Sequence, residues 1–338
     1  MTAGHTGSPN AALRAHPQGL AGRRRELALL EQAVEALSGG SPPVIQISGE
    51  PGIGKTRLLV ELGALAGRSG QTVLWGRAAE FERQVPFGIF TNALEDHLTT
   101  IEPDRLGQLG EDRLGLLSRV FPALPSVQEG GPAAGLMDVE RYRLHRAMRA
   151  LLEVMAEAEP LVLVLDDVHW ADDGSVELLD HLLRHPPRAR LLLALAYRPR
   201  QLPVRLGEAL TRAVAQGLAE SLDVGPLTPA EADDLLPTGI PGTTRQELYR
   251  ASGGNPFYLD ALVRGGAGHT GGAVAESRLE PDGDVPAQVR AALAAELAAL
   301  TPAQLVVAQA AAVAGEVFEG DLVALIASFD VVAPEIDR

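Results

Sequence analysis

The sequence predicts an α/β protein with a doubly wound parallel sheet, followed by helical segments. Two observations support this class. Short runs of apolar residues recur between positions 44 and 224, and they alternate with segments of helical periodicity. Such runs are typical of parallel strands buried on both faces, and alternation of strands with helices indicates this kind of sheet. The expected strands are residues 44–48, 72–75, 161–165, 191–197 and, more weakly, 221–224.

The helices are predicted from apolar residues that recur every three or four positions. In the first helix, for example, Leu27, Leu30 and Val34 share one stripe. The expected helices are residues 24–37, a segment that begins near 55, an interrupted stretch over 86–120, a long helix over 138–158, and three short helices over 228–263. Residues 122–135, rich in Pro and Gly, are expected to form a loop.

The same patterns predict how the chain is organised into domains. We expect a disordered arm over residues 1–18, the α/β domain over 19–226 and a helical domain over 227–264. A flexible linker over 265–284 and a further helical module over 285–338 are expected to follow. Within that module, Thr301 and Pro302 are typical of an N-cap and the first helical turn.

The composition of the 338-residue chain excludes several classes of function. The net charge is −15 at pH 7, and an acidic surface is a poor match for nucleic acid, so we expect no direct nucleic-acid contact. The absence of cysteine excludes disulfides, Cys-ligated zinc and thiol catalysis, and agrees with a cytoplasmic location. No apolar run approaches the ~20 residues that span a membrane. We therefore expect neither a secretory signal nor a membrane partner.

A glycine-rich loop between the first strand and the next helix indicates a phosphate-binding site. Residues 49–56 read GEPGIGKT and match G-x-x-x-x-G-K-[ST] at every fixed position. The glycines let backbone N–H groups point inward, and the helix adds its positive N-terminal end. Lys55 is expected to reach the β- and γ-phosphates, and the Thr56 hydroxyl to ligate Mg²⁺. The residues expected to contact the nucleotide here are Gly49, Gly52, Ile53, Gly54, Lys55, Thr56 and Arg57.

Lys55 is the only lysine in the chain, because the 29 basic residues are 28 arginines and this one lysine. A compact ammonium suits a slot along a phosphate-binding loop better than a planar guanidinium does. The guanine-reading pattern N-K-x-D needs a second lysine, so its absence favours ATP or ADP over guanine nucleotides.

A pair of carboxylates, Asp166 and Asp167, directly follows the third expected strand, residues 161–165. Ligands of open α/β sheets bind at the carboxyl ends of the strands. Asp166 is therefore predicted to hold the Mg²⁺ shell, and Asp167 to orient or deprotonate the attacking water. A structural role for Asp167, such as a helix N-cap, is the alternative.

Arg198 directly follows the expected strand 191–197 and is predicted to sense the γ-phosphate as a third catalytic residue. The alternative is an exposed arginine in a turn before Pro199. His169 and Trp170 follow the acidic pair and are interpreted as structural, since no second His or Cys accompanies them in a metal-binding pattern.

Several segments together resemble the STAND NTPases, the signal-transduction ATPases with numerous domains. Residues 20–27, LAGRRREL, resemble the element before the phosphate-binding loop in that family, and the likeness places Gly22 and Arg23 at the nucleotide. Residues 163–173, LVLDDVHWADD, are similar to the acidic motif of the bacterial subgroup with large ATP-binding LuxR-type and MalT-like regulators. Residues 252–259, SGGNPFYL, resemble another element of that subgroup, and the likeness places Pro256 near the adenine.

The resemblance covers about residues 19–327 and implies a P-loop fold of the AAA+/STAND type, with residues 285–338 starting a winged-helix-like module. It also implies a slow, Mg²⁺-dependent ATPase that acts as a switch. ADP would hold the domains closed, and exchange for ATP would open them for self-association or for contact with other domains. Because the family's helix-turn-helix is absent, we expect a truncated form, or the ATPase half, of a larger regulator.

Two other classes of function stay open. One is a turnover enzyme, such as a small-molecule kinase or a remodelling ATPase, which needs a second substrate pocket or an arginine supplied by a neighbouring subunit. The other is a scaffold that binds nucleotide without hydrolysing it. The second is favoured by Asp167, which is one methylene shorter than the glutamate of many fast ATPases.

Overall fold

The computed structural model describes residues 22–39, 44–125, 138–267, 294, 297 and 300–314. The chain divides into two compact units, Met1–Phe257 and Tyr258–Arg338. The predicted arm over 1–18, residues 268–284 of the predicted linker, and most of the predicted module over 285–338 lie outside the described residues. So does most of the predicted loop over 122–135.

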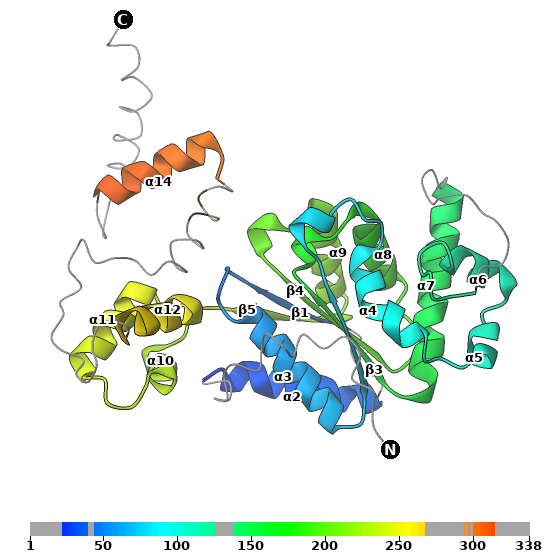
Figure 1. The fold of residues 1–338 in the computed structure, drawn as a ribbon, viewed down its shortest axis with the longest axis horizontal. Coiled ribbons are helices and arrows are strands. Elements are labelled where there is room, and N and C mark those ends of the chain that lie inside the picture. Colours follow the sequence, from blue (N-terminus) through cyan, green and yellow to red (C-terminus); the bar gives the residue numbers. More distant parts are fainter. Residues whose placement is uncertain are drawn as a thin grey trace, which may run out of the picture. The chain divides into compact units, whose positions relative to one another are not determined.

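The first unit contains a five-stranded sheet in the order β2-β3-β4-β1-β5, and all the neighbouring strands are parallel (Figure 1). This confirms the predicted fold class. The strands are β1 Val44–Gly49, β2 Thr72–Arg77, β3 Leu161–Asp166, β4 Leu191–Tyr197 and β5 Ala219–Val224. Each predicted strand is present, and β2 and β5 extend two residues further than the sequence indicated.

Helices alternate with these strands and continue after the last one. The helices up to β5 are α2 Arg24–Gly39, α3 Lys55–Arg68, α4 Gly88–Leu98, α5 Pro103–Gly107, α6 Glu111–Leu117, α7 Asp138–Ala158, α8 Asp173–Arg184 and α9 Val204–Ala215. Those after β5 are α10 Pro229–Leu235, α11 Gly242–Ser252, α12 Pro256–Ala267 and α14 Pro302–Ala314. Short 3₁₀ turns occupy Glu80–Glu82, Val168–Trp170 and Pro199–Gln201.

The sheet lies between two layers of helices, and each layer has its own hydrophobic core (Figure 1). Side chains alternate along β3: Leu163 and Leu165 pack in the core with α4 and α6–α9, whereas Val162 and Val164 pack in the core with α2 and α3. This alternation explains why the strand sequence is apolar throughout, since both of its faces are buried.

Two helix starts carry reciprocal caps. Thr228 and Glu231 form a capping box at α10, with each side chain bonded to the other residue's backbone. At α14 the Thr301 hydroxyl accepts from the Gln304 backbone N–H, which confirms the predicted N-cap. Helix α12 runs to Ala267 and so includes the first three residues of the predicted linker, 265–267.

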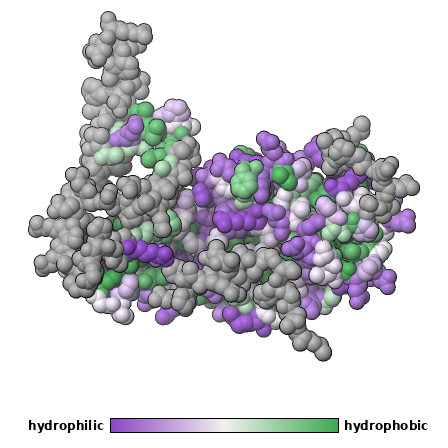
Figure 2. Space-filling model, in the orientation of Figure 1, coloured by the Kyte–Doolittle hydropathy of each residue, from purple (hydrophilic) through white to green (hydrophobic). Residues whose placement is uncertain are grey.

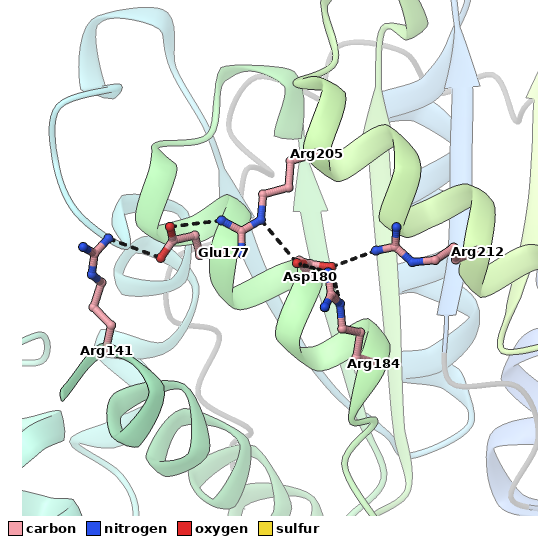
Figure 3. Close-up of polar contacts among 6 residues, drawn as sticks. All are labelled: Arg141, Glu177, Asp180, Arg184, Arg205 and Arg212. Atoms are coloured by element: carbon pink, nitrogen blue, oxygen red, sulfur yellow. Dashed lines mark hydrogen bonds and ion pairs between the residues drawn. The ribbon is translucent and has the colours of Figure 1, made fainter. Parts of the chain in front are cut away.

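A network of ion pairs joins helices α7, α8 and α9 on the outer surface (Figure 3). The carboxylate of Asp180 is buried, with 3% of its side chain exposed, and it lies 2.9–3.3 Å from the guanidinium groups of Arg184, Arg205 and Arg212. Glu177 in turn pairs with Arg205 at 3.1 Å and with Arg141 at 3.6 Å. One buried acid thus holds together three arginines that would otherwise repel one another.

The Asp180→Asn variant is expected to lower the free energy of unfolding by about 2 kcal/mol, because it leaves three neighbouring guanidiniums without their common counter-ion. Urea denaturation monitored by circular dichroism measures this. The matched control is Asp260→Asn, whose i,i+4 pair with Arg264 is exposed and is expected to cost less than about 0.5 kcal/mol. Equal losses in the two variants would contradict the structural role of Asp180.

Within the described residues, no helix is long and apolar enough to cross a membrane. Figure 2 shows hydrophilic and hydrophobic residues interspersed over the described surface that is visible in this view.

Candidate nucleotide-binding site

The carboxyl ends of the parallel strands bring the predicted site residues to one edge of the sheet. The glycine loop follows β1, Asp166 ends β3 and Arg198 follows β4. Strand β4 pairs with both β1 and β3, so these three strand ends are neighbours. Segments 110 to 150 residues apart in sequence therefore meet at the place where open α/β sheets bind ligands.

The glycine loop has the backbone shape that its sequence predicts. Gly52 and Gly54 have φ values of 72° and 107°, in the left-handed region that favours glycine. Apart from its chain neighbours, no described atom lies within 4 Å of the position that a Cβ of Gly54 would take, so the space beside Gly54 is open. The loop leads directly into the N-terminus of α3, whose free N–H groups and positive dipole end favour a phosphate.

Lys55 lies along this loop with its side chain buried. Its ammonium donates to the backbone carbonyls of Gly49 and Glu50, both at 2.9 Å. Burial, followed by the positive charge of Arg198, lowers the pKa of Lys55. The charge of Arg198 therefore acts at Lys55, and both residues belong to the same edge of the sheet. In the described part of the chain, no hydrogen bond or ion pair engages the Arg198 guanidinium.

Thr56 and Asp166 meet across the site, because the Thr56 hydroxyl donates to Asp166 Oδ2 at 2.8 Å. Burial, and then the charge of Asp167, raises the pKa of Asp166. A hydroxyl and a carboxylate are the oxygen ligands that Mg²⁺ takes from proteins beside nucleotide phosphates. No cluster of three or more metal-binding side chains occurs among the described residues. The pair therefore fits a Mg²⁺ ion that is shared with phosphates and water.

Asp167 has a partner that the sequence did not reveal. The Nε and Nη2 atoms of Arg77 donate to Asp167 Oδ2 at 3.1 and 2.8 Å. Arg77 ends β2 and is in register with Asp166 on β3, so the sheet itself brings the two together. Asp167 has a positive φ of 55°, and its side chain caps no helix. The predicted candidate base is thus held by a half-buried ion pair at the edge of the site.

Two further residues of the acidic motif, Asp172 and His169, have structural roles. Asp172 accepts hydrogen bonds from the backbone N–H groups of Phe87, Gly88 and Ser175 at 2.9–3.1 Å, and so joins the starts of α4 and α8. His169 is fully buried, and burial lowers its pKa to about 4, so its ring is neutral at pH 7. Neither ring nitrogen of His169 finds a hydrogen-bond partner in the described residues.

The segment before α2 also reaches the loop. The buried Arg23 guanidinium donates to the carbonyls of Ile53 at 3.3 Å and Gly225 at 2.6 Å. The backbone N–H of Arg23 donates to Glu231 at 2.9 Å. A Cβ on Gly22 would lie 2.6 Å from the Glu231 side chain, so this close approach requires glycine. The guanidinium of Arg23 is thus directed at backbone carbonyls that border the loop.

Residues after α11 contact the outer side of the glycine loop. Asn255 Nδ2 donates to the carbonyl of Pro51 at 2.9 Å, and its Oδ1 accepts from the backbone of Phe257 at 3.0 Å. A Cβ on Gly52 would lie 2.8 Å from Cβ of Phe257. Pro256 stands between these two contact residues. The sequence did not predict that Asn255 binds the loop.

The remaining two predicted contact residues, Ile53 and Arg57, have other partners in the structure. Ile53 is buried in the core beneath α2 and α3. Arg57 pairs with Glu61 one turn later on α3, at 2.8 Å.

Comparison with known proteins agrees with this geometry. The model of the AAA ATPase domain family matches residues 19–194, which include the glycine loop, Asp166 and Asp167. An uncharacterized protein, R02095, of Rhizobium meliloti (strain 1021) is 26% identical over 265 residues, covering 72% of this chain. The chain spans only 25% of the length of that relative.

Solved structures with a similar fold include the Walker-type ATPase PABY2304 of Pyrococcus abyssi, with 15% identity and a TM-score of 0.46, covering 84% of this chain and 75% of that one. Another is the STAND protein PH0952 of Pyrococcus horikoshii, which has a tetratricopeptide repeat sensor. It is 18% identical with a TM-score of 0.40, covering 73% of this chain and 30% of that one.

AAA ATPase domains bind and hydrolyse nucleotide, typically as Mg-ATP. P-loop NTPases use a glycine loop with its lysine, a Ser or Thr and an Asp for this purpose, and residues of these types meet at this edge of the sheet. The family match covers more than half of the chain. The chain belongs to the AAA ATPase domain family.

Proposed function

We propose that this chain is a nucleotide-controlled switch with slow ATPase activity, and that it is the ATPase part of a longer LuxR-type transcriptional regulator of the STAND class. In this proposal ADP stabilises a closed arrangement. ATP releases residues 227–257 from the glycine loop and allows self-association or contact with other domains. Lys55 and Arg198 bind the phosphates, Thr56 and Asp166 hold Mg²⁺, and Pro256 borders the adenine.

The observation that carries the proposal is the contact between residues 227–257 and the glycine loop. Asn255 binds the carbonyl of Pro51, and Phe257 packs on Gly52. Glu231 of α10 holds the backbone of Arg23, whose guanidinium binds the carbonyl of Ile53. A change in the loop on nucleotide exchange therefore acts directly on the segment after the sheet.

The free energy that contacts with the γ-phosphate can supply is sufficient to drive such a switch. A ligand shifts a two-state equilibrium only by the difference between its affinities for the two states. A change from about 1:99 to 99:1 requires about 5.5 kcal/mol. The γ-phosphate adds two or three charge-assisted contacts, each worth about 1.5–3 kcal/mol, and Lys55, Mg²⁺ and Arg198 are the groups proposed to make them.

Hydrogen exchange measured by mass spectrometry tests this proposal. The amides of α10 and α11 are expected to exchange more slowly with ADP and Mg²⁺ than with a non-hydrolysable ATP analogue. Equal exchange in the two nucleotide states would rule out the switch while leaving nucleotide binding intact.

The Asn255→Ala variant is expected to weaken ADP binding about fivefold relative to the ATP analogue, because one hydrogen bond of the closed arrangement, worth about 1 kcal/mol, is lost. Isothermal titration calorimetry gives both affinities. The control is Gln246→Ala, an exposed amide on α11, for which the ratio should not change. A ratio in Asn255→Ala equal to that of the wild type would show that the contact does not depend on the nucleotide.

One observation favours the second candidate, a scaffold that holds nucleotide without hydrolysis. The ion pair with Arg77 engages the same carboxylate that would have to activate water. Single-turnover hydrolysis with radiolabelled ATP separates the candidates. No phosphate release over hours favours the scaffold, slow release favours the switch, and steady turnover well above about 1 s⁻¹ favours a turnover enzyme.

A further inference from the structure

A second hollow lies at the opposite edge of the sheet from the nucleotide site. It has a volume of about 790 Å³ and is formed by α5–α7 and the segment that enters β4. Residues 188–190 precede the N-terminal end of β4, whereas Arg198 follows its C-terminal end. The hollow, called the arginine groove below, is lined by Gln108, Leu109, Arg113, Arg149, Ala150, Glu153, Val154, Ala156, Glu157, Arg188, Ala189 and Arg190.

Positive charge exceeds negative charge in the arginine groove. Four of its twelve lining residues are arginines and two are glutamates, although the chain as a whole carries a net charge of −15. With 28 arginines in 338 residues, an average set of twelve would contain about one, by comparison with uniform usage. An excess of two positive charges at one place on an acidic protein requires an explanation.

Glu153 forms a long ion pair with Arg149, and the two glutamates offset the four arginines only in part. Glu153 accepts from the backbone N–H of Arg188 at 2.9 Å. The nearest acid oxygen to the buried Nε of Arg149 is also on Glu153, at 3.8 Å, and that Nε makes no hydrogen bond. Among the described residues, the Arg190 guanidinium reaches only the backbone carbonyl of Glu157, at 3.5 Å. In the described residues, the guanidinium groups of Arg113 and Arg188 enter no hydrogen bond or ion pair.

The network around Asp180 shows what a structural arginine cluster looks like in this protein. There, each guanidinium is fixed by a carboxylate at 3.6 Å or less, and one of the two acids is buried between three arginines (Figure 3). The arginine groove lacks such an acid. Arg113, Arg188 and Arg190 are exposed, so water hydrates their guanidinium groups and a ligand can reach their donors.

We propose that the arginine groove binds a small phosphate compound with two negative charges, such as a phosphate monoester or an oligophosphate. A phosphate monoester carries a charge of about −1.5 to −2 at pH 7, which matches the excess of two positive charges. Guanidinium groups bind phosphate oxygens in pairs of hydrogen bonds, and Arg113 and Arg188 have these donors available. The volume lies within the range of ~300–1,000 Å³ that is typical of small-molecule sites.

Isothermal titration calorimetry with inorganic pyrophosphate tests the proposal. It is carried out without Mg²⁺, on the Lys55→Ala variant and on wild-type protein that holds one equivalent of ADP after removal of the excess, so that the glycine loop is weakened in one sample and filled in the other without free ADP to compete at the groove. We expect one site with a dissociation constant below about 1 mM that weakens as salt is raised. The double substitution Arg113→Gln/Arg188→Gln should weaken this binding at least tenfold.

The control is Arg68→Gln/Arg143→Gln, which removes the same charge from two exposed arginines outside the groove, and it should leave the affinity unchanged. Absence of binding in both samples would overturn the proposal. So would equal weakening by the two double substitutions, which would indicate a general effect of charge. The inference does not depend on hydrolysis or on the switch, so failure of the proposed function would not affect it.

Discussion

Replacing Lys55 with alanine is expected to weaken ADP binding about 10- to 150-fold without unfolding the protein. In the structure the ammonium is buried beside the glycine loop and donates only to the carbonyls of Gly49 and Glu50. We expect water to enter the space that the side chain leaves and to bond these carbonyls, so that the fold loses little. The bound phosphates lose a charge-assisted contact in a partly desolvated site, and the loss of one such donor costs about 1.5–3 kcal/mol or more.

Isothermal titration with ADP and Mg²⁺ measures the effect, and thermal denaturation verifies that the fold is intact. Lys55→Arg keeps the positive charge but introduces a planar group, and we expect it to bind weakly as well, because the slot holds a compact ammonium. Arg68→Ala, on the exposed last turn of the same helix, should bind like the wild type. Micromolar ADP affinity in Lys55→Ala would show that the nucleotide lies elsewhere.

The sheet and the centre of this site could be predicted from sequence because their signals are local. Each strand is a continuous apolar run, and the glycine loop is a contiguous motif next to a strand and a helix. The ends of parallel strands meet at one edge whatever their order, so the proximity of Thr56 to Asp166 followed without knowledge of the topology. These features depend on residues close together in the chain.

The partners of the site residues could not be predicted in this way. Arg77 reaches Asp167 only because β2 lies beside β3, and the order of the strands is not written in either segment. The contact of Asn255 with Pro51 joins residues 204 positions apart. Polar residues in turns have many possible partners, and only packing selects one. The one sequence feature that could have pointed to Arg77 was its position at the end of an apolar run.

The domain boundary shows the same limit. The change from alternating strands to helices led to a predicted boundary at 226, whereas α10 and α11 group with the sheet in the unit that ends at Phe257. The reason is visible in long-range contacts: Glu231 is bound to Arg23 and Asn255 to Pro51. A helical segment can thus be part of the nucleotide-binding unit without contributing a strand to it. The predicted boundary at 226 concerns whether the segments before and after it fold independently, and it stays a prediction.

The Asp167→Asn variant is expected to slow ATP hydrolysis at least 100-fold while changing ADP affinity less than about threefold. A positioned general base contributes 10²–10⁴-fold, and an amide of the same size cannot accept the proton. Phosphate binding is expected to persist, because Lys55, Thr56 and Arg198 are unchanged. The Arg77 pair keeps an oxygen acceptor in the variant, so the edge of the sheet should hold its shape.

Single-turnover phosphate release from excess enzyme measures this rate, since a slow ATPase is difficult to follow in steady state. Asp173→Asn is the matched control, because Asp173 belongs to the same acidic motif but is exposed in the first turn of α8. It should hydrolyse ATP at the wild-type rate. A wild-type rate in Asp167→Asn would assign the activation of water to another group. The ion pair with Arg77 would then be a structural bridge between β2 and β3, which would place Asp167 with Asp172 among the acids that organise the sheet edge.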